Sequence, residues 1–300
     1  MFNLIKVFQL KKNISFNKNI GKATWFGTGG SSRIFFRPYN ENELALFLKL
    51  IPKNFPRFIL GLGSNIIFRD GFYNGAVIKL DQGFNYFKIN NNELKIGAGT
   101  RDIDIVKYTL AQNITGFEFL VGIPGTLGGS LTMNSSCFDY CISDNLISAD
   151  IMDQNGNVKS VYKDELMFSY RNCKLPKNHI FINATFKFRR SAKTKIKNRI
   201  EKFKAKRKET QPIGARTGGS TFMNHGNLKA WKLIEKCGLR GEKFGNAKIS
   251  DKHCNFLINL GSSSSTELEI LGEDIIEKVF KKEKIRLEWE IKRVGNFKKI

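Results

Sequence analysis

The glycine-rich stretch FEFLVGIPGTLGGSLTMN, residues 117–134, is the first candidate for chemistry in this sequence. Gly122, Gly125, Gly128 and Gly129 lie within eight positions of one another. Glycine costs roughly 0.5–1 kcal/mol relative to alanine inside a regular element, so such a cluster is tolerated where the backbone turns sharply or approaches a ligand. Backbone N–H groups in tight loops bind anions, and a phosphate-bearing ligand is therefore the first expectation.

The familiar phosphate-binding patterns do not fit this stretch. A P-loop requires G-x-x-x-x-G-K-[ST], and the chain contains no Gly-Lys-Ser or Gly-Lys-Thr. A Rossmann fingerprint requires G-x-G-x-x-G, whereas the spacing here is G-x-x-G-x-x-G-G. A second loop, GLGSN at 61–65, offers further glycines and a hydroxyl. Each loop could contact one side of a diphosphate, or each could be only a turn.

The elements that must position these loops alternate between helix and strand in the first part of the chain. Apolar spacing predicts helices at 41–51 and 101–113, strands at 57–60, 66–68, 75–80 and 179–189, and a strand followed by a turn within 93–100. The Asn-Gly pair within 154–157 predicts a hairpin. Ile196, Ile200 and Phe203 predict an amphipathic helix over 193–209 with a basic solvated face.

The last third of the chain has a different pattern. We expect a helix at 227–238 that Gly238 ends. Thr266 and Glu269 have the spacing of a capping box, which would open a helix through Lys282. Residues 285–294 alternate apolar and charged side chains, which predicts a final strand. A boundary near 190–210 therefore separates an α/β front from a smaller α/β back domain.

Composition narrows the class of protein. Hydrophobic residues make up 41% of the chain, yet no apolar run approaches the roughly 20 residues of a membrane span. Lys6, Lys11 and Lys12 interrupt the N-terminus too often for a signal peptide. The five cysteines form no C-x-x-C pair and there are only three histidines, so we expect no disulfide framework and no metal site. A cytoplasmic protein without a membrane partner is the expectation.

The charge leaves a second class of function open. Lys and Arg total 50 against 27 acidic residues, a formal net charge of +23. Such an excess raises the possibility of a nucleic-acid partner, and residues 193–209 are the densest basic segment. The lysines are nevertheless spread along the whole chain, and charge runs on helices are usually solvated faces. We therefore expect no nucleic-acid partner.

A series of short motifs occurs in a recognisable order over nearly the whole chain, from Thr24 to Gly295. They read TWFGTGGSS, GLGSNIIF, GFEFLVGIPGTLGGSLTMN, SYRN, RKETQP, TGGSTFMN, DKHCNFLIN and LEWEIKRVG. Together they closely resemble the UDP-N-acetylenolpyruvoylglucosamine reductase family of peptidoglycan precursor synthesis. Only 36 residues separate Arg171 from Lys208, which is similar to the shorter, type II branch without an inserted substrate-clamping loop.

The resemblance implies an α+β fold without the Rossmann fingerprint. It would combine an FAD-binding fold of the vanillyl-alcohol-oxidase (PCMH) type, made of two α+β subdomains, with a C-terminal α/β substrate-binding domain. The expected ranges are 1–80 and 81–192 for the two subdomains and 193–300 for the substrate-binding domain. A monomer is expected, and its partners would be NADPH and a UDP-sugar.

The resemblance also implies non-covalent FAD as cofactor, with NADPH as the hydride donor. The positions that match the cofactor loops are Gly61, Gly63, Ser64, Asn65, Ile66, Gly122, Ile123, Pro124, Gly125, Thr126, Gly128, Gly129 and Asn134. The implied reaction reduces UDP-N-acetylglucosamine enolpyruvate to UDP-N-acetylmuramate. Hydride addition to C3 of the vinyl group pushes electrons toward the carboxylate, and C2 must then receive a proton.

Three matched positions suit this chemistry. Arg171 would bind the substrate carboxylate with its planar, permanently charged guanidinium. Ser220 would donate the proton to C2, and Glu290 would act with the arginine on the enolate. Plainer roles exist for each: Arg171 could cap an element, Ser220 could be a turn residue, and Glu290 could lie on a solvated charged face.

Contacts to the UDP-sugar are implied at Tyr170, Arg207, Gln211 and Asn224. Some family members have lysine where this chain has Gln211. The family commonly has Asn-Pro in place of Asn224-His225 and MNAGA-like sequence in place of MNSSC at 133–137. These departures concern local loop geometry. An FAD oxidase of the same fold with another substrate is the alternative enzyme.

Overall fold

The chain forms two compact units, each assembled from three stretches of sequence. The computed structural model describes residues 8–80 and 82–298. The first unit comprises Met1–Phe16, Ile34–Gly61 and Gly75–Ala205, and the second comprises Asn17–Arg33, Leu62–Asn74 and Lys206–Ile300. The subdomain boundaries expected at residues 80 and 192 stay a prediction. The expectation of no signal peptide falls partly on residues 1–7, which lie outside the described residues.

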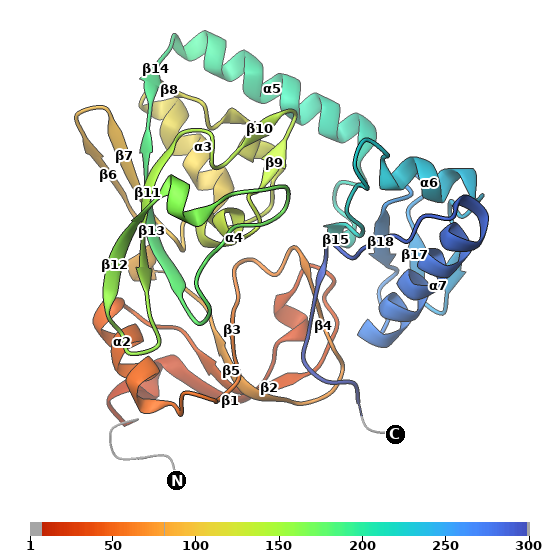
Figure 1. The fold of residues 1–300 in the computed structure, drawn as a ribbon, viewed down its shortest axis with the longest axis horizontal. Coiled ribbons are helices and arrows are strands. Elements are labelled where there is room, and N and C mark those ends of the chain that lie inside the picture. The colour runs from red at the N-terminus through yellow and green to blue at the C-terminus, as the bar shows by residue number, and fades with distance from the viewer. Residues whose placement is uncertain (1–7, 81, 299–300) are drawn as a thin grey trace. The chain divides into compact units, whose positions relative to one another are not determined.

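A four-stranded sheet in the order β1-β2-β5-β3 packs against helix α2 (Figure 1). Its strands are β1 (Ile14–Asn19), β2 (Ser31–Phe36), β3 (Arg57–Ile59) and β5 (Tyr73–Ile78). Helix α2 (Glu41–Leu50) begins where the Asn40 side chain accepts a hydrogen bond from the backbone N–H of Glu43, the usual N-cap arrangement. The Phe47 ring stacks on Phe36 with centroids 4.2 Å apart. The helix expected at 41–51 is confirmed.

A five-stranded antiparallel sheet in the order β12-β11-β13-β7-β6 is the larger sheet of the first unit. Its strands are β6 (Phe87–Asn90), β7 (Glu93–Gly97), β11 (Leu146–Met152), β12 (Val158–Tyr162) and β13 (Ile180–Lys187). The hairpin expected within 154–157 joins β11 to β12, and the Asp153 carboxylate accepts hydrogen bonds from the N–H groups of Asn155 and Asn157. The prediction from the Asn-Gly pair is confirmed.

Helices and short elements complete the first unit. The helices are α3 (Asp102–Ala111), α4 (Leu127–Thr132) and the part of α5 (Lys193–Thr210) that ends at Ala205. The 3-10 turns are η1 (Phe8–Asn13), η3 (Gln82–Phe84), η4 (Glu118–Gly122) and η5 (Lys163–Leu166). Two short strand pairs are β8 (Ile114–Thr115) with β14 (Arg189–Arg190), and β9 (Ser136–Cys137) with β10 (Tyr140–Cys141). Ile196 and Ile200 on α5 are buried and Phe203 is half-buried, as the apolar spacing predicts.

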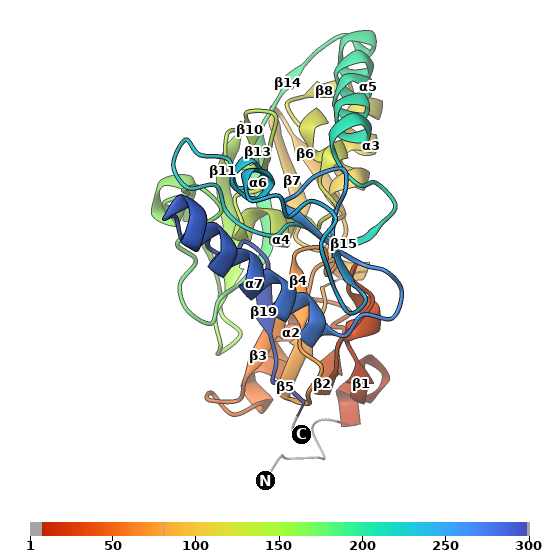
Figure 2. The same cartoon turned by 90° about the vertical axis from the view of Figure 1, so that its right-hand side faces the viewer.

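The second unit contains a small antiparallel sheet and two helices. The sheet order is β15-β18-β17-β16. The elements of the unit are η2 (Gly21–Ala23), β4 (Ile66–Phe68), β15 (Arg216–Ser220), α6 (Ala230–Lys236), β16 (Lys243–Phe244), β17 (Ala247–Ile249), β18 (Phe256–Asn259), α7 (Ser265–Glu283) and β19 (Lys292–Val294). Helix α7 runs beside β19 (Figure 2), and β19 pairs in parallel with β4.

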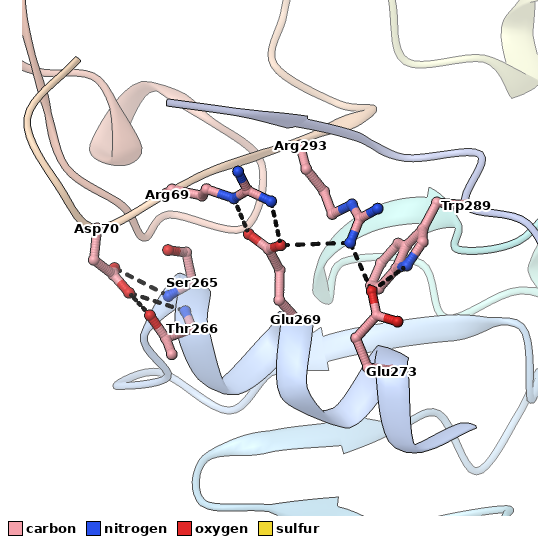
Figure 3. Close-up of polar contacts among 8 residues, drawn as sticks. All are labelled: Arg69, Asp70, Ser265, Thr266, Glu269, Glu273, Trp289 and Arg293. Carbon is pink, nitrogen blue, oxygen red and sulfur yellow. Dashed lines mark hydrogen bonds and ion pairs between the residues drawn. The ribbon is translucent and has the colours of Figure 1, made fainter. Parts of the chain in front are cut away.

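The start of α7 differs from the expected capping box. The box is made by Ser264 and Glu267, two residues earlier than predicted. Thr266 instead donates from both its N–H and its hydroxyl to the carboxylate of Asp70, which also accepts from the N–H of Ser265 (Figure 3). Helix α7 therefore receives a second acceptor at its N-terminus from a distant loop, which satisfies donors that a helix leaves unpaired.

The final strand is shorter than predicted. Only Lys292–Val294 forms a regular strand, and residues 285–291 contribute a single isolated bridge, between Trp289 and Phe222. The alternation itself is observed, since Leu287 and Ile291 are buried while the charged side chains at 286 and 288 are exposed. The prediction of a strand over 285–291 is wrong because alternating burial does not require a pairing neighbour.

No helix within the described residues combines the length and apolar character needed to cross a membrane.

Candidate active site

The glycine-rich stretch forms a loop between η4 and α4 that is tied to the turn after β7. The N–H of Leu127 donates to the carbonyl of Thr100 over 2.9 Å. The N–H of Gly128 donates to the carbonyl of Ala98 over 2.9 Å. These bonds connect two segments of the first unit and attach the loop to the turn after β7.

Close packing explains two of the glycines in the predicted cofactor loops. The carbonyl of Gly125 accepts from the N–H of Asp102 over 3.0 Å, and a Cβ atom added to Gly125 would lie 2.4 Å from Oδ2 of Asp102. One added to Gly61 would lie 2.7 Å from Oγ1 of Thr126. The structure therefore places Gly61 beside the 122–129 loop within the first unit.

Asp102 is an acidic residue that sequence reasoning missed. Its side chain is buried under the Gly125 turn, where Oδ2 accepts a hydrogen bond from the Ser130 hydroxyl over 2.7 Å. Oδ1 has no hydrogen-bond partner among the described residues. Burial raises the pKa of this carboxyl to about 7, although the Ser130 hydrogen bond opposes the rise. In the sequence, Asp102 looks like an ordinary acidic residue in the first turn of a helix, and no neighbouring residue indicates that its side chain is buried.

Asn134 brings the predicted residues Tyr170 and Arg171 to the end of the same loop. Its side-chain N–H₂ donates to the carbonyl of Ser169 over 3.0 Å. Arg171 has a left-handed backbone with φ 55°, and its Nη1 donates to the hydroxyl of Ser136 over 2.7 Å. The guanidinium carbon of Arg171 lies 5.2 Å from the centre of the Tyr170 ring. Ser136 lies in a stretch that departs from the family pattern, and here it holds the predicted carboxylate-binding arginine.

The second unit brings Asn65, Ser220 and Glu290 together. The carbonyl of Asn65 accepts from the N–H of Lys292 over 3.0 Å, and its side-chain amide donates to the carbonyl of Glu290 over 3.3 Å. The N–H of Glu290 donates to the carbonyl of Thr221, the residue after Ser220, over 2.8 Å. Two predicted catalytic residues that are 70 positions apart in sequence are thus joined through neighbouring backbone groups.

The remaining predicted cofactor residues of the second unit belong to the same loop. Gly63 has a left-handed backbone with φ 69°, and its carbonyl accepts from the N–H of Trp25 over 2.9 Å. Ile66 is the first residue of β4. A Cβ atom added to Gly219 would lie 4.0 Å from the carbonyl oxygen of Ser64, so this loop and the end of β15 face each other.

The predicted substrate residues of the second unit have local hydrogen-bond partners. Nε of Arg207 donates to Oε1 of Gln211 over 2.9 Å, at the end of α5. Oδ1 of Asn224 accepts from the N–H of Ala230 over 3.0 Å and so supports the start of α6. The side chains of Arg207 and Gln211 are therefore oriented together, which suits recognition of one anionic group.

The first-unit loop has two features that fit a bound cofactor with hydrogen-bond donors. The Oδ1 atom of Asn134 is buried and lacks a hydrogen-bond partner among the described residues. Buried polar atoms are hydrogen-bonded as a rule, so a donor on a bound cofactor would complete the hydrogen bonding of this oxygen. A Cβ atom added to Gly129 would meet nothing nearer than Oγ1 of Thr126, at 3.6 Å. The space beside the α-carbon of Gly129 is therefore open. Within the described residues, no group of three or more His, Cys, Asp or Glu side chains could hold a metal ion.

Comparisons with known proteins match both parts of the chain. An FAD binding domain model matches residues 32–162, and a model described as the UDP-N-acetylenolpyruvoylglucosamine reductase C-terminal domain matches residues 211–294. The reductases of that name from Rickettsia canadensis and Gluconobacter oxydans are 42% and 41% identical to the chain. The alignments cover 93% and 95% of this chain and 95% and 94% of those proteins.

A solved structure agrees with the sequence comparisons. The crystal structure of UDP-N-acetylenolpyruvylglucosamine reductase from Thermus caldophilus superimposes with a TM-score of 0.82 at 27% sequence identity. The similarity covers 92% of this chain and 97% of that one.

Proposed function

The chain belongs to the UDP-N-acetylenolpyruvoylglucosamine reductase family, and we propose that it reduces UDP-N-acetylglucosamine enolpyruvate to UDP-N-acetylmuramate with NADPH as the hydride donor. Its fold is α+β, with an FAD-binding domain followed by the C-terminal domain of the family, as expected from the sequence. It is an FAD-dependent oxidoreductase. The observation that supports the reaction best is the backbone link between Ser220 and Glu290 through Thr221.

The residues proposed to hold FAD are those of the two glycine loops. They are Gly61, Gly122, Ile123, Pro124, Gly125, Thr126, Gly128, Gly129 and Asn134 of the first unit and Gly63, Ser64, Asn65 and Ile66 of the second. When bound, FAD supplies the chemistry of hydride transfer from NADPH to the vinyl group. Loop N–H groups other than those of Leu127 and Gly128, which donate to backbone carbonyls, are proposed to bind its diphosphate, and the buried Oδ1 of Asn134 supplies an acceptor.

Three side chains are proposed to act on the substrate. Arg171 binds the carboxylate bidentately and stabilises the negative charge that hydride addition delivers there. The Ser136 hydroxyl, which accepts from Arg171 Nη1, fixes the rotamer of that guanidinium. Ser220 holds the proton that C2 receives, and Glu290 acts beside it on the enolate. The proposed contacts to the UDP-sugar are Tyr170, Arg207, Gln211 and Asn224.

The cellular setting is proposed on the same basis. UDP-N-acetylmuramate is a nucleotide-activated sugar acid, and its formation would supply peptidoglycan synthesis, on which cell shape and division depend. We propose that the reaction takes place in the cytoplasm, with a monomeric enzyme that has neither a nucleic-acid nor a membrane partner.

An absorption spectrum of the purified protein, recorded before and after the addition of NADPH and then of substrate, tests the proposal. The purified protein is expected to show the absorption bands of bound flavin at about 370 and 450 nm. Anaerobic NADPH should bleach the bands, and UDP-N-acetylglucosamine enolpyruvate should restore them. UDP-N-acetylglucosamine without the enolpyruvyl group is the control and should leave the flavin reduced. A colourless protein that takes up no FAD, or a reduced flavin that the enolpyruvyl substrate leaves bleached, would overturn the proposal.

A further inference from the structure

The segment that carries Glu290 is held in place with little regular secondary structure. Glu290 lies three residues after the buried Leu287 and two before β19 begins, outside any ladder. Its N–H donates to the carbonyl of Thr221, and the carbonyl of Glu288 accepts from the N–H of Met223. Besides these backbone bonds, the side chains on either side of Glu290 connect the segment to helix α7.

Trp289, the residue before Glu290, packs against helix α7. Its indole Nε1–H donates to Oε1 of Glu273 over 2.9 Å. Its ring lies over Gly272, where an added Cβ atom would be 2.1 Å from the ring carbon Cη2. The ring centre of Phe222 lies 5.2 Å from that of the indole. Any residue larger than glycine at position 272 would displace the indole, so α7 determines where Trp289 lies.

Arg293, three residues after Glu290, is bound to the same carboxylate. Its Nη1 lies 2.6 Å from Oε1 of Glu273 and 3.7 Å from Oε2 of Glu269 (Figure 3). Its guanidinium carbon also lies 4.8 Å from the centre of the Trp289 ring. Glu273 thus holds the chain on both sides of Glu290 at once.

The same network reaches the strand that follows the second-unit cofactor loop. Arg69, directly after β4, donates from Nε and Nη2 to the two carboxylate oxygens of Glu269 over 2.8 and 3.0 Å. Such a two-pronged pair has a defined geometry as well as a favourable energy. Glu269 is buried and lies one turn before Glu273 on α7. Arg69, next to β4, and Arg293, in β19, therefore both contact the same face of α7.

We propose that Glu273 is a positioning residue for Glu290, acting through Trp289 and Arg293. The inference rests on the proposed role of Glu290 in the reaction. Glu273 is half-exposed on a helix, where an acidic side chain is ordinarily only a solvated charge. Its contacts instead place it at the junction of the two side chains that flank a catalytic position.

The test compares Glu273→Ala with a matched variant of the same helix. Glu277→Ala is the control, because the ion pair of Glu277 within the described residues is with the exposed Arg286, at 3.4 Å. We expect Glu273→Ala to leave flavin reduction by NADPH unchanged and to slow reoxidation by the enolpyruvyl substrate roughly fivefold to tenfold, the scale of one net hydrogen bond. Glu273→Gln, which keeps an acceptor for both donors, should recover most of the rate.

A second background shows whether the effect passes through Glu290. In a Glu290→Gln protein, which is itself expected to reoxidise slowly, Glu273→Ala should cause no further loss, because residues that act as one unit are not additive. An equal slowing of reoxidation with and without Glu290, or an equal slowing of both half-reactions, would overturn the positioning role.

A measurement without turnover separates this inference from the proposed function. The chain has three tryptophans, so the indole N–H resonance of Trp289 can be assigned in an NMR spectrum with a Trp289→Phe protein. Glu273→Ala should shift that resonance and Glu277→Ala should not. An unmoved resonance overturns the inference alone. A shifted resonance together with normal reoxidation by Glu290→Gln would instead contradict the catalytic role of Glu290.

Discussion

Ser220 is the residue whose proposed role depends most on its surroundings. An isolated serine hydroxyl is a very weak acid, so proton donation to C2 requires hydrogen bonding that stabilises the resulting alkoxide. Ser220 ends β15, and the next carbonyl, that of Thr221, receives the N–H of Glu290. This arrangement places the hydroxyl at a strand end whose backbone is already fixed.

Replacing Ser220 by alanine should separate the two half-reactions. Flavin reduction by NADPH needs no proton at C2, so its rate should stay near that of the unaltered protein. Reoxidation by the enolpyruvyl substrate should fall by at least about 10²-fold, the lower range for general acid catalysis. Anaerobic stopped-flow absorbance measures both rates, with the exposed Ser262→Ala in the same unit as a control. Equal losses in the two half-reactions would contradict the proton-donor role.

Asp102 should make the stability of the protein depend on pH. In the unfolded chain the pKa of an aspartate is about 4, whereas burial raises the folded-state pKa of Asp102 to about 7. The folded state therefore binds one more proton between these values, and its free energy of unfolding should fall as the pH rises from about 4 to about 7 and then level off. Asp102→Asn removes this ionisation and keeps an acceptor for Ser130.

Denaturant unfolding at several pH values measures the effect. The stability of Asp102→Asn relative to the unaltered protein should rise across this window, by at most about 4 kcal/mol. Asp104→Asn on the same helix, where the carboxylate pairs with the exposed Arg101 at 2.6 Å, is the control. Parallel curves for Asp102→Asn and the unaltered protein would contradict the raised pKa.

At the scale of elements, the N-terminus of α7 depends on Asp70. Burial raises the pKa of Asp70, but hydrogen bonds from Thr266 and Ser265 outweigh it, so the pKa lies below its ordinary value. Asp70→Ala should lower the free energy of unfolding at pH 7 by about 1–2 kcal/mol, the range for losing a helix cap. Because the folded-state pKa is depressed, the difference should be complete above about pH 4 and be lost as the pH falls through the folded-state pKa.

Chemical denaturation from pH 7 down to about pH 2, below the ordinary pKa of an aspartate, checks this prediction. Glu277→Ala is the control on the same helix. A difference of equal size over the whole range would mean that Asp70 acts through packing rather than through its charge.

The elements that could be predicted from the sequence are those whose signal is local. Ile196 and Ile200 bury one side of α5 as their spacing indicates. The capping box expected for α7 is wrong because the pattern occurs twice in 264–269. The choice between the two depends on Asp70 and Arg69, about 200 positions away, and no local pattern contains that information.

The candidate site shows the same limit. Arg171, Ser220 and Glu290 are identified only through whole-chain resemblance, since each also suits an ordinary local role. Asp102 and Glu273 have no signal in the sequence, because their environments are created by other segments. For Asp102 that segment is the turn at 125, and for Glu273 it is the stretch 289–293.

At the scale of the whole molecule, the net charge of +23 calls for a separate test. We expect weak binding to duplex DNA at low salt that carries no sequence preference, with an affinity that falls steeply as salt increases. Replacing the exposed Lys195, Lys197 and Lys202 of α5 by glutamine should weaken this binding and leave both half-reactions unchanged. Electrophoretic mobility shifts at about 50 and 200 mM salt measure it. Sequence-selective binding that persists at the higher salt would restore the nucleic-acid-binding hypothesis.

The composition of the two units could not be read from the sequence. The domain boundary expected near 190–210 stays a prediction, and the compact units of the structure divide after Phe16, Arg33, Gly61, Asn74 and Ala205. Nothing local indicates that residues 17–33 and 62–74 group with the C-terminal part, because that grouping depends on pairings such as β4 with β19.

The parallel pairing of β4 with β19 has a consequence for synthesis on the ribosome. Residues 66–68 leave the exit tunnel long before their partners, residues 292–294, have been made. During that interval the nascent β4 exposes an unpaired edge, the kind of surface that templates aggregation. A chaperone bound to β4, or the mutual repulsion of chains with a net charge of +23, would oppose such aggregation until residues 292–294 have been made.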